Sequence, residues 1–278
     1  MTAQDGAERR VALLVSYAGG AFAGFQRQPA ADTVQSRLEQ ALGALLGGPV
    51  TVRGAGRTDA GVHAAGQVVD CLLPPGCPLP PQRLPQALAG RLPPDIAVAA
   101  AFAVPADFHA RKSAVSKRYR YLLWREATAS PFWRPYAWHY SGHLDTAAMG
   151  AAAAVLLGRH DFRAFAGAAR PVADARRTLL GAAVYGEGPW LAIEIEADGF
   201  LYRMVRAIAG TLLEVGRGAM SVADVRGLLR DGLRSAAGPS LPAHGLCLLW
   251  VRYPAAAGLP APGGPPWPPP PGPPPWRA

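Results

Sequence analysis

Apolar and polar positions alternate along the first hundred residues in blocks typical of strands and helices in turn. The run Val11–Tyr17 is nearly all apolar, which predicts a buried strand. After a glycine-rich turn, Asp32 or Thr33 can cap a helix whose apolar positions share one face, namely Val34, Leu38, Leu42 and Leu45. Further strands are predicted at 50–52 and 95–104, a strand or a strand–helix stretch at 66–73, and a helix at 82–92. This order predicts an α/β or α+β fold.

The pattern restarts after Pro105. Strands are predicted at 116–124, 179–185, 190–196 and 246–253, and helices at 145–157, 200–215 and 222–229. The middle two strands form a hairpin about Gly186-Glu187-Gly188. We therefore expect an α/β (α+β) fold of two similar domains, each with a mixed, mostly antiparallel sheet and helices on one face. The expected boundaries are 1–8 for a flexible N-terminus, 9–106 and 107–253 for the domains, and 254–278 for a proline-rich disordered tail.

Composition and charge narrow the classes of protein. Half of the residues are hydrophobic and 17% are charged, as in folded proteins. No apolar run reaches the roughly 20 residues of a membrane span, so we expect no association with a membrane. Residues 1–10 hold no apolar core of a signal peptide, so we expect the protein in the cytoplasm. Three cysteines supply neither a disulfide framework nor a zinc site. The net charge of +9 favours a polyanionic partner, although a GC-rich genome would also explain the preference for arginine.

The most polar motif is a glycine-rich loop at residues 54–63, Gly-Ala-Gly-Arg-Thr-Asp-Ala-Gly-Val-His. It gathers Arg57, Asp59 and His63 directly after a strand-like run. Glycines permit tight turns and close approach to a ligand, and functional groups often lie on such loops. We interpret the loop as a site. The alternative is a tight turn in which Arg57 and Asp59 only pair with each other.

Basic and aromatic residues alternate at 116–121, Ser-Lys-Arg-Tyr-Arg-Tyr. On a strand, Tyr119 and Tyr121 would share one face and Arg118 and Arg120 the other. Aromatic rings stack on RNA bases and arginines bind phosphates, but an amphipathic strand with tyrosines in the core explains the pattern equally well.

Residues 200–210 predict an amphipathic helix with two arginines, Arg203 and Arg206, on one face. A buried arginine there requires a carboxylate partner, because an unpaired buried charge is very costly.

Residues 56–63, Gly-Arg-Thr-Asp-Ala-Gly-Val-His, resemble the signature of the tRNA pseudouridine synthase A family. Residues 108–111, 116–121, 204–206 and 245–248 resemble further motifs of that family, and the likeness extends over roughly 11–253. The chain departs from the usual pattern at Ala18, Phe25 and Ala164, where the family commonly has aspartate, tryptophan and serine. None of these departures removes a catalytic group.

The resemblance implies that uridines 38–40 in the anticodon stem-loop of tRNA are isomerised to pseudouridine, without a cofactor or metal. It implies three catalytic residues: Asp59 as nucleophile, Arg206 as its basic partner and Tyr119 at the target base. The implied substrate-binding residues are Tyr119, Arg57, Leu246, Arg111 and Arg203. It also implies a homodimer that binds tRNA with both subunits, in a basic cleft between the two domains.

The alternative is a noncatalytic basic RNA-binding protein, in which Asp59 would be dispensable. A glycoside hydrolase is disfavoured because such enzymes commonly use two carboxylates. A P-loop enzyme is excluded because the loop lacks the terminal Gly-Lys-Ser/Thr. The sequence leaves open whether Asp59 attacks C1′ of the ribose or C6 of the base, and whether His63 contacts phosphate or caps the loop.

Overall fold

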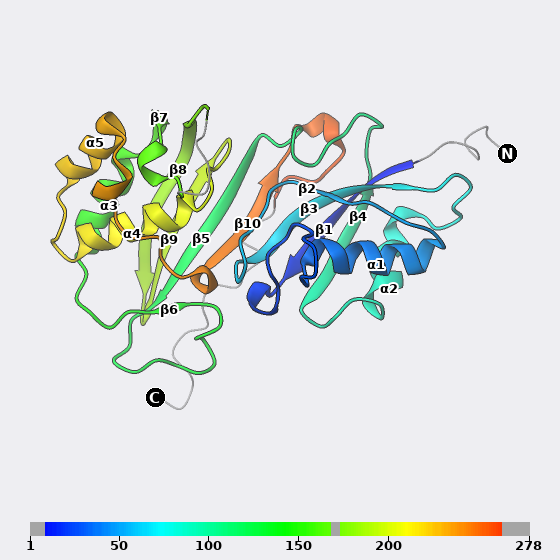
Figure 1. Ribbon diagram of the computed structural model, residues 1–278, viewed down its shortest axis with the longest axis horizontal. Helices are drawn as coiled ribbons and strands as arrows, with labels where there is room; N and C mark the ends of the chain where they lie inside the picture. The colour runs from blue at the N-terminus through cyan, green and yellow to red at the C-terminus, as the bar shows by residue number, and fades with distance from the viewer. Residues whose placement is uncertain (1–8, 168–172, 263–278) are drawn as a thin grey trace. The chain divides into compact units, whose positions relative to one another are not determined.

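The computed structural model describes residues 9–167 and 173–262, and these form two compact units (Figure 1). Unit 1 contains residues 9–115 and 248–262, and unit 2 contains residues 116–167 and 173–247. Each unit has its own strands and its own helices. The chain thus leaves unit 1 at residue 115 and returns to it at residue 248.

The strands of unit 1 are centred on β1 (Arg9–Tyr17), which pairs antiparallel with β3 (His63–Leu73) and β4 (Ile96–Ala103). The short β2 (Arg53–Gly54) pairs with β3, and so does β10 (Leu246–Arg252), whose residues from 248 onward belong to this unit. Four apolar residues of β1 are fully buried: Val11, Ala12, Leu13 and Val15. The predicted buried strand at 11–17 is confirmed, and it forms the centre of this part of the core.

Two helices belong to unit 1, α1 (Val34–Leu46) and α2 (Leu84–Ala89). Thr33, one of the two predicted caps, accepts a hydrogen bond from the Ser36 amide, and Gly47 ends the helix in the left-handed conformation. The predicted buried face is confirmed at Val34, Leu38 and Leu42, while Leu45 is half-buried. The helix predicted at 82–92 is shorter, because residues 81–83 form a 3-10 turn and Gly90 ends α2.

The strand predicted at 50–52 is wrong. The backbone of Val52 bonds instead to side chains of α1: its amide donates to the Glu39 carboxylate at 3.1 Å and its carbonyl accepts from Gln35 Nε2 at 3.1 Å. Side-chain partners have replaced strand partners here, and the ladder begins only at Arg53.

The strands of unit 2 lie in the order β5 (Ser116–Trp124), β9 (Trp190–Ala197), β8 (Arg176–Glu187) and β7 (Gly158–Asp161), all antiparallel. The short β6 (Trp138–His139) pairs parallel with β5. The predicted hairpin is confirmed, but its turn lies later than expected, because Glu187 pairs with Trp190 and leaves only Gly188 and Pro189 between the strands. The fold-class prediction of a mixed α/β protein with mostly antiparallel strands is confirmed.

Three helices belong to unit 2: α3 (Thr146–Val155), α4 (Met204–Gly216) and α5 (Val222–Asp231). Figure 1 shows them grouped beside β7, β8 and β9. Asp145 caps α3 as predicted, by accepting a hydrogen bond from the Ala148 amide. The helix predicted from residue 200 begins only at Met204, because Arg203 adopts a left-handed conformation with φ 57°.

Six 3-10 turns complete the elements: η1 (Gly19–Ala21), η2 (Pro81–Arg83), η3 (Arg163–Phe165), η4 (Arg234–Ala236), η5 (Ala243–Gly245) and η6 (Ala255–Ala257). The predicted N-terminal segment and most of the predicted tail lie outside the described residues. Within 9–167 and 173–262, no helix has the length and apolar character to cross a membrane.

Candidate active site

The glycine-rich loop runs from the end of the short β2 into the start of the long β3, so a strand fixes each of its ends. The Ala55 amide donates to the Val68 carbonyl at 2.8 Å, and the Val62 amide donates to the Asp59 carbonyl at 3.1 Å. Gly61 has φ 80°, which permits this tight turn. Asp59 is therefore held half-buried at the turn of a short and well-bonded loop.

A second glycine-rich segment, residues 18–28, packs directly against this loop. The Phe25 amide donates to the Thr58 carbonyl at 3.0 Å. A Cβ atom on Gly24 would come within 2.8 Å of that carbonyl oxygen, and one on Gly19 within 2.0 Å of the Val62 oxygen. The two backbones approach so closely that only glycine fits at both positions.

Buried polar side chains tie the loop to the sheet below it. The hydroxyl groups of Tyr17 and Thr58 are hydrogen-bonded at 2.8 Å, and Gln67 Nε2 donates to the Gly56 carbonyl at 2.9 Å. His63 is buried, and its Nδ1 accepts a hydrogen bond from the Gly19 amide at 3.0 Å. Of the two roles left open for His63, the contact supports the one in which it fixes the loop.

Arg57 projects from the same loop and is exposed. Backbone hydrogen bonds to β3 and to residues 18–28 hold this loop, so its shape does not depend on a pair between Arg57 and Asp59 alone.

Arg111 also belongs to unit 1, on the segment 106–113 after β4. Its side chain is exposed, and its amide donates to Nδ1 of His109 at 3.2 Å. Burial and the nearby Arg53 and Lys112 lower the pKa of His109, which keeps the ring neutral at pH 7.

Tyr119 and Tyr121 lie on β5 in unit 2, and both are buried. The ring of Tyr119 meets Phe200 edge to face at 5.0 Å. Tyr121 donates its hydroxyl to the Pro242 carbonyl at 2.9 Å, and its ring lies against Gly245, where a Cβ would come within 2.6 Å. Burial raises the pKa of Tyr121 well above its usual value, so this side chain is a packed donor.

Arg118 and Arg120 face glutamates on β9, the strand beside β5. Arg118 binds Glu196 at 2.8 Å and Arg120 binds Glu194 at 2.7 Å, each directly across the ladder. These carboxylates offset the arginine charges. The structure therefore favours an amphipathic strand with paired charges over phosphate binding by these two arginines.

Arg203 and Arg206 do not share a helix face as predicted, because α4 begins between them. Arg203 is exposed, with its guanidinium 5.0 Å from the centre of the Tyr202 ring. Arg206 lies in the first turn of α4, half-buried, and its Nε donates to the Leu241 carbonyl at 2.6 Å. Leu246 follows η5 at the start of β10 and is buried.

The sequence-based site residues thus divide between the two units. Unit 1 carries Arg57, Asp59 and Arg111, and unit 2 carries Tyr119, Arg203, Arg206 and Leu246. Tyr17, Gln67 and Gly24 help to fix the glycine-rich loop, a role that the sequence alone did not reveal. The signal for Gln67 was present, since it is a polar residue within a mostly apolar strand. Among the described residues, no group of three or more His, Cys, Asp or Glu side chains is placed to hold a metal ion.

A family model and several relatives match most of this chain, including most of the candidate site residues. The model of a family described as tRNA pseudouridine synthase matches residues 13–111 and 152–254, which include Asp59 and Arg206. A protein from Geobacter sp. (strain M21) named tRNA pseudouridine synthase A is 43% identical over 88% of this chain and 99% of its own length. The protein of the same name from Moorella thermoacetica is 44% identical over 87% of this chain and 98% of its own length. The one from Halalkalibacterium halodurans is 46% identical over 86% of this chain and 90% of its own length.

Similarity to solved structures is weak. A Cbf5–Nop10–Gar1 complex aligns with a TM-score of 0.32 and 11% identity over 73% of this chain and 45% of that chain. The family match and the relatives, which align over nearly their whole length, show the family of this chain. The signature loop of residues 56–63 forms a tight turn framed by glycines. The chain belongs to the tRNA pseudouridine synthase family and is a tRNA-modifying isomerase of the tRNA pseudouridine synthase A type.

Proposed function

We propose that this enzyme converts uridine to pseudouridine in the anticodon stem-loop of tRNA, with Asp59 as the nucleophile. The observation that carries the proposal is the fixation of Asp59: its loop is bonded to β3, to residues 18–28 and to the buried side chains of Tyr17, Gln67 and His63. A nucleophile must be held in one geometry relative to the reacting carbon, and such a frame provides it without loss of entropy at each turnover.

The reaction is an isomerisation whose atoms balance without an external reagent. The N1–C1′ bond breaks, the uracil ring turns, the C5–C1′ bond forms, C5 loses a proton and N1 gains one. Asp59 would form and then release a covalent bond, at C1′ of the ribose or at C6 of the base. Tyr119 would stack on or hydrogen-bond the uracil and assist removal of the C5 proton.

The remaining assignments follow from the family resemblance. Arg206 would pair with the Asp59 carboxylate and fix its orientation, and Leu246 would line the uracil pocket. Arg57 would occupy the space left when the target nucleotide leaves the stack, which offsets an unstacking cost of a few kcal/mol. Exposed Arg203 and Arg111 would bind phosphates. Residues of both subunits of a homodimer would contact one tRNA.

We also place the enzyme in the cytoplasm. All three cysteines are free thiols, with Cys71 and Cys247 buried. Free thiols are typical of a reducing compartment.

The test is release of tritium from tRNA labelled at C5 of uridine, combined with mapping of the modified positions. Wild type should release tritium and modify only anticodon stem-loop uridines. Asp59→Asn and Asp59→Ala should bind the same tRNA but lose at least about 1,000-fold in rate, because a neutral or absent side chain cannot act as the nucleophile.

Asp32→Asn is the matched control, since Asp32 is an exposed carboxylate that pairs with Arg37 at the start of α1. It should retain wild-type release. Release by Asp59→Ala would exclude Asp59 as the nucleophile, and modification outside the anticodon stem-loop would overturn the proposed target. Binding without any release by wild type would favour the noncatalytic alternative.

A further inference from the structure

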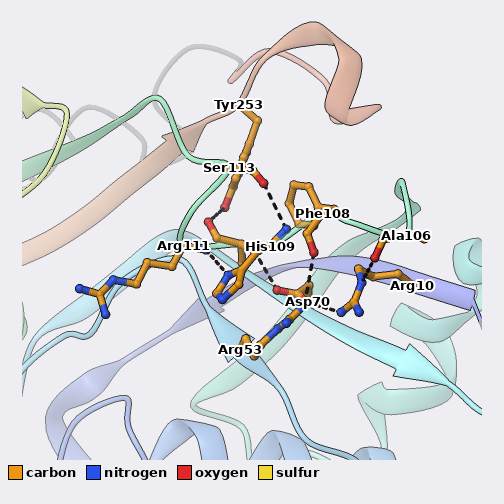
Figure 2. Close-up of polar contacts among 10 residues, drawn as sticks. Arg10, Arg53, Asp70, Ala106, Phe108, His109, Arg111, Ser113 and Tyr253 are labelled. Atoms are coloured by element: carbon orange, nitrogen blue, oxygen red, sulfur yellow. Dashed lines mark hydrogen bonds and ion pairs between the residues drawn. The ribbon is translucent and has the colours of Figure 1, made fainter.

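A second buried carboxylate, Asp70, has no place in the proposed chemistry. It lies on β3 and is completely buried. Two arginines from neighbouring strands converge on its Oδ2 atom: Arg10 of β1 at 2.8 Å, and Arg53 of β2 through both Nε, at 3.0 Å, and its terminal nitrogen (Figure 2). A buried carboxylate without such partners would be very costly, so the cluster of Asp70, Arg10 and Arg53 forms one ionic unit.

Each member of this ionic unit also holds the backbone of the segment 106–113. The other oxygen of Asp70, Oδ1, accepts a hydrogen bond from the Ala110 amide at 2.8 Å. Arg10 Nε donates to the Ala106 carbonyl at 2.8 Å, and Arg53 donates to the Phe108 carbonyl at 3.2 Å. Every second residue from 106 to 110 is therefore bonded to a charged group of the sheet (Figure 2).

Uncharged contacts also hold the segment 106–113 in place. Tyr253 donates its hydroxyl to the Ala110 carbonyl at 2.6 Å, and its ring packs on Phe108 at 5.2 Å. The His109 amide donates to Ser113 Oγ at 3.1 Å, while the Ser113 amide donates to the His109 carbonyl at 2.9 Å. The turn between residues 109 and 113 has a defined shape.

Two adjacent cations project from this turn. Arg111 and Lys112 are both exposed, and Figure 2 shows the Arg111 side chain directed away from the ionic unit. The ionic unit itself carries one negative and two positive charges, so it adds positive charge beneath the turn. A rigid turn that bears two exposed cations beside this positively charged unit suits a polyanion such as a phosphate backbone.

We propose that Asp70 is a positioning residue for tRNA binding: through Arg10, Arg53 and the Ala110 amide it fixes the segment 106–113 so that Arg111 meets a phosphate of the tRNA backbone. The inference rests on the proposed function, which assigns Arg111 to phosphate binding. An apolar cluster would hold the sheet together as well as an ionic one. Only the charged groups supply three directed bonds to alternate residues of the segment.

A double-mutant cycle tests this inference by tRNA binding, a readout separate from catalysis. Asp70→Asn, Arg111→Ala and the double variant are compared by filter binding of tRNA over a series of salt concentrations. Each single variant should weaken binding by about ten-fold and lower the salt slope by about one, because about one phosphate contact is lost. The double variant should bind no worse than Arg111→Ala, since Asp70 acts on binding through the segment that carries Arg111.

Unfolding by urea separates positioning from mere stabilisation. Asp70→Asn should lower the unfolding midpoint equally with or without Arg111, so its effects should add for stability but not for binding. Additive effects on binding would overturn the proposal, and so would an unchanged salt slope in Asp70→Asn.

If Asp70→Asn does not fold, Tyr253→Phe tests whether the position of the segment 106–113 affects tRNA binding. This variant removes only the hydrogen bond to the Ala110 carbonyl. It should weaken tRNA binding in the presence of Arg111 and not in its absence, and equal weakening in both backgrounds would overturn the proposal. Asp32→Asn, which breaks an exposed pair in the same unit, should leave binding unchanged. A wild type that binds tRNA without releasing tritium would count against the proposed chemistry alone.

Discussion

Single residues in and beside the glycine-rich loop owe their identity to the space around them. Gly24 and Gly20 lie in the same glycine-rich segment, yet they differ sharply. Gly24 has φ 99° and faces the Thr58 carbonyl, whereas a Cβ on Gly20 would meet nothing within 4 Å. The two positions therefore form a natural pair of probe and control for the frame that holds Asp59.

Gly24→Ala should destabilise the protein by about 1–3 kcal/mol and reduce turnover more than tRNA binding, because strain at this position moves the Thr58–Asp59 backbone. Gly20→Ala should leave both unchanged. Steady-state kinetics and urea unfolding of the two variants check this. Wild-type kcat in Gly24→Ala would mean that the contact does not position the loop.

At the scale of elements, the hydrophobic pattern was sufficient to predict most strands and helices. The pattern of β1, β5, α1 and the β8–β9 hairpin depends on burial of a local face, which neighbours in the sequence reveal. The failures arise where a distant or backbone-specific partner decides. Side chains of α1 take the hydrogen bonds of Val52, and the left-handed Arg203 delays the start of α4.

The candidate site follows the same division. The signature loop was visible in the sequence because its residues are contiguous. The ionic unit about Asp70 was not, because Arg10 is 60 residues away and Ala110 is 40 residues away. The one local signal was a carboxylate within the apolar run of β3. The partners of Arg118 and Arg120 on β9 were likewise hidden, which is why the sequence left their role open.

The ladder between β5 and β9 yields a prediction for Arg120. Its guanidinium is buried against Glu194, which also accepts a hydrogen bond from Tyr185 at 2.7 Å. Arg120→Met should cost at most about 3–5 kcal/mol of stability, since it leaves the Glu194 carboxylate with its bond from Tyr185 and a longer contact to Arg118 at 3.4 Å. The salt slope of tRNA binding should stay at the wild-type value.

Arg120→Met combined with Glu194→Gln should recover part of the lost stability, because the second change removes a largely buried charge that has lost its nearer cation. Urea unfolding and salt-dependent binding measure the two effects. A reduced salt slope in Arg120→Met would show that this arginine does contact phosphate.

At the scale of the whole molecule, each unit contains a histidine that the fold keeps neutral. Burial, with Arg53 and Lys112, lowers the pKa of His109 in unit 1. Burial, with Arg134 and Arg206, lowers the pKa of His244 in unit 2. In the unfolded chain both would titrate near 6.5.

Stability should therefore fall as the pH decreases below about 6.5, because the unfolded chain then binds protons that the folded chain does not. Above that pH both states are neutral at these rings, and the contribution is constant. Urea unfolding between pH 5 and pH 8 measures the slope, and His109→Asn with His244→Asn should flatten it. An equal slope in that double variant would assign the pH dependence to other groups.

The return of the chain to unit 1 at residue 248 has a consequence for synthesis on the ribosome. β10 pairs with β3, the Val115 amide donates to the Arg252 carbonyl, and Tyr253 holds the segment of Arg111. Unit 2 is continuous from 116 to 247 and is made before these pieces exist. Unit 2 can thus fold before unit 1 is complete during synthesis. The segment 106–113, which is proposed to bind tRNA, reaches its final form only when β10 and Tyr253 have left the exit tunnel of the ribosome.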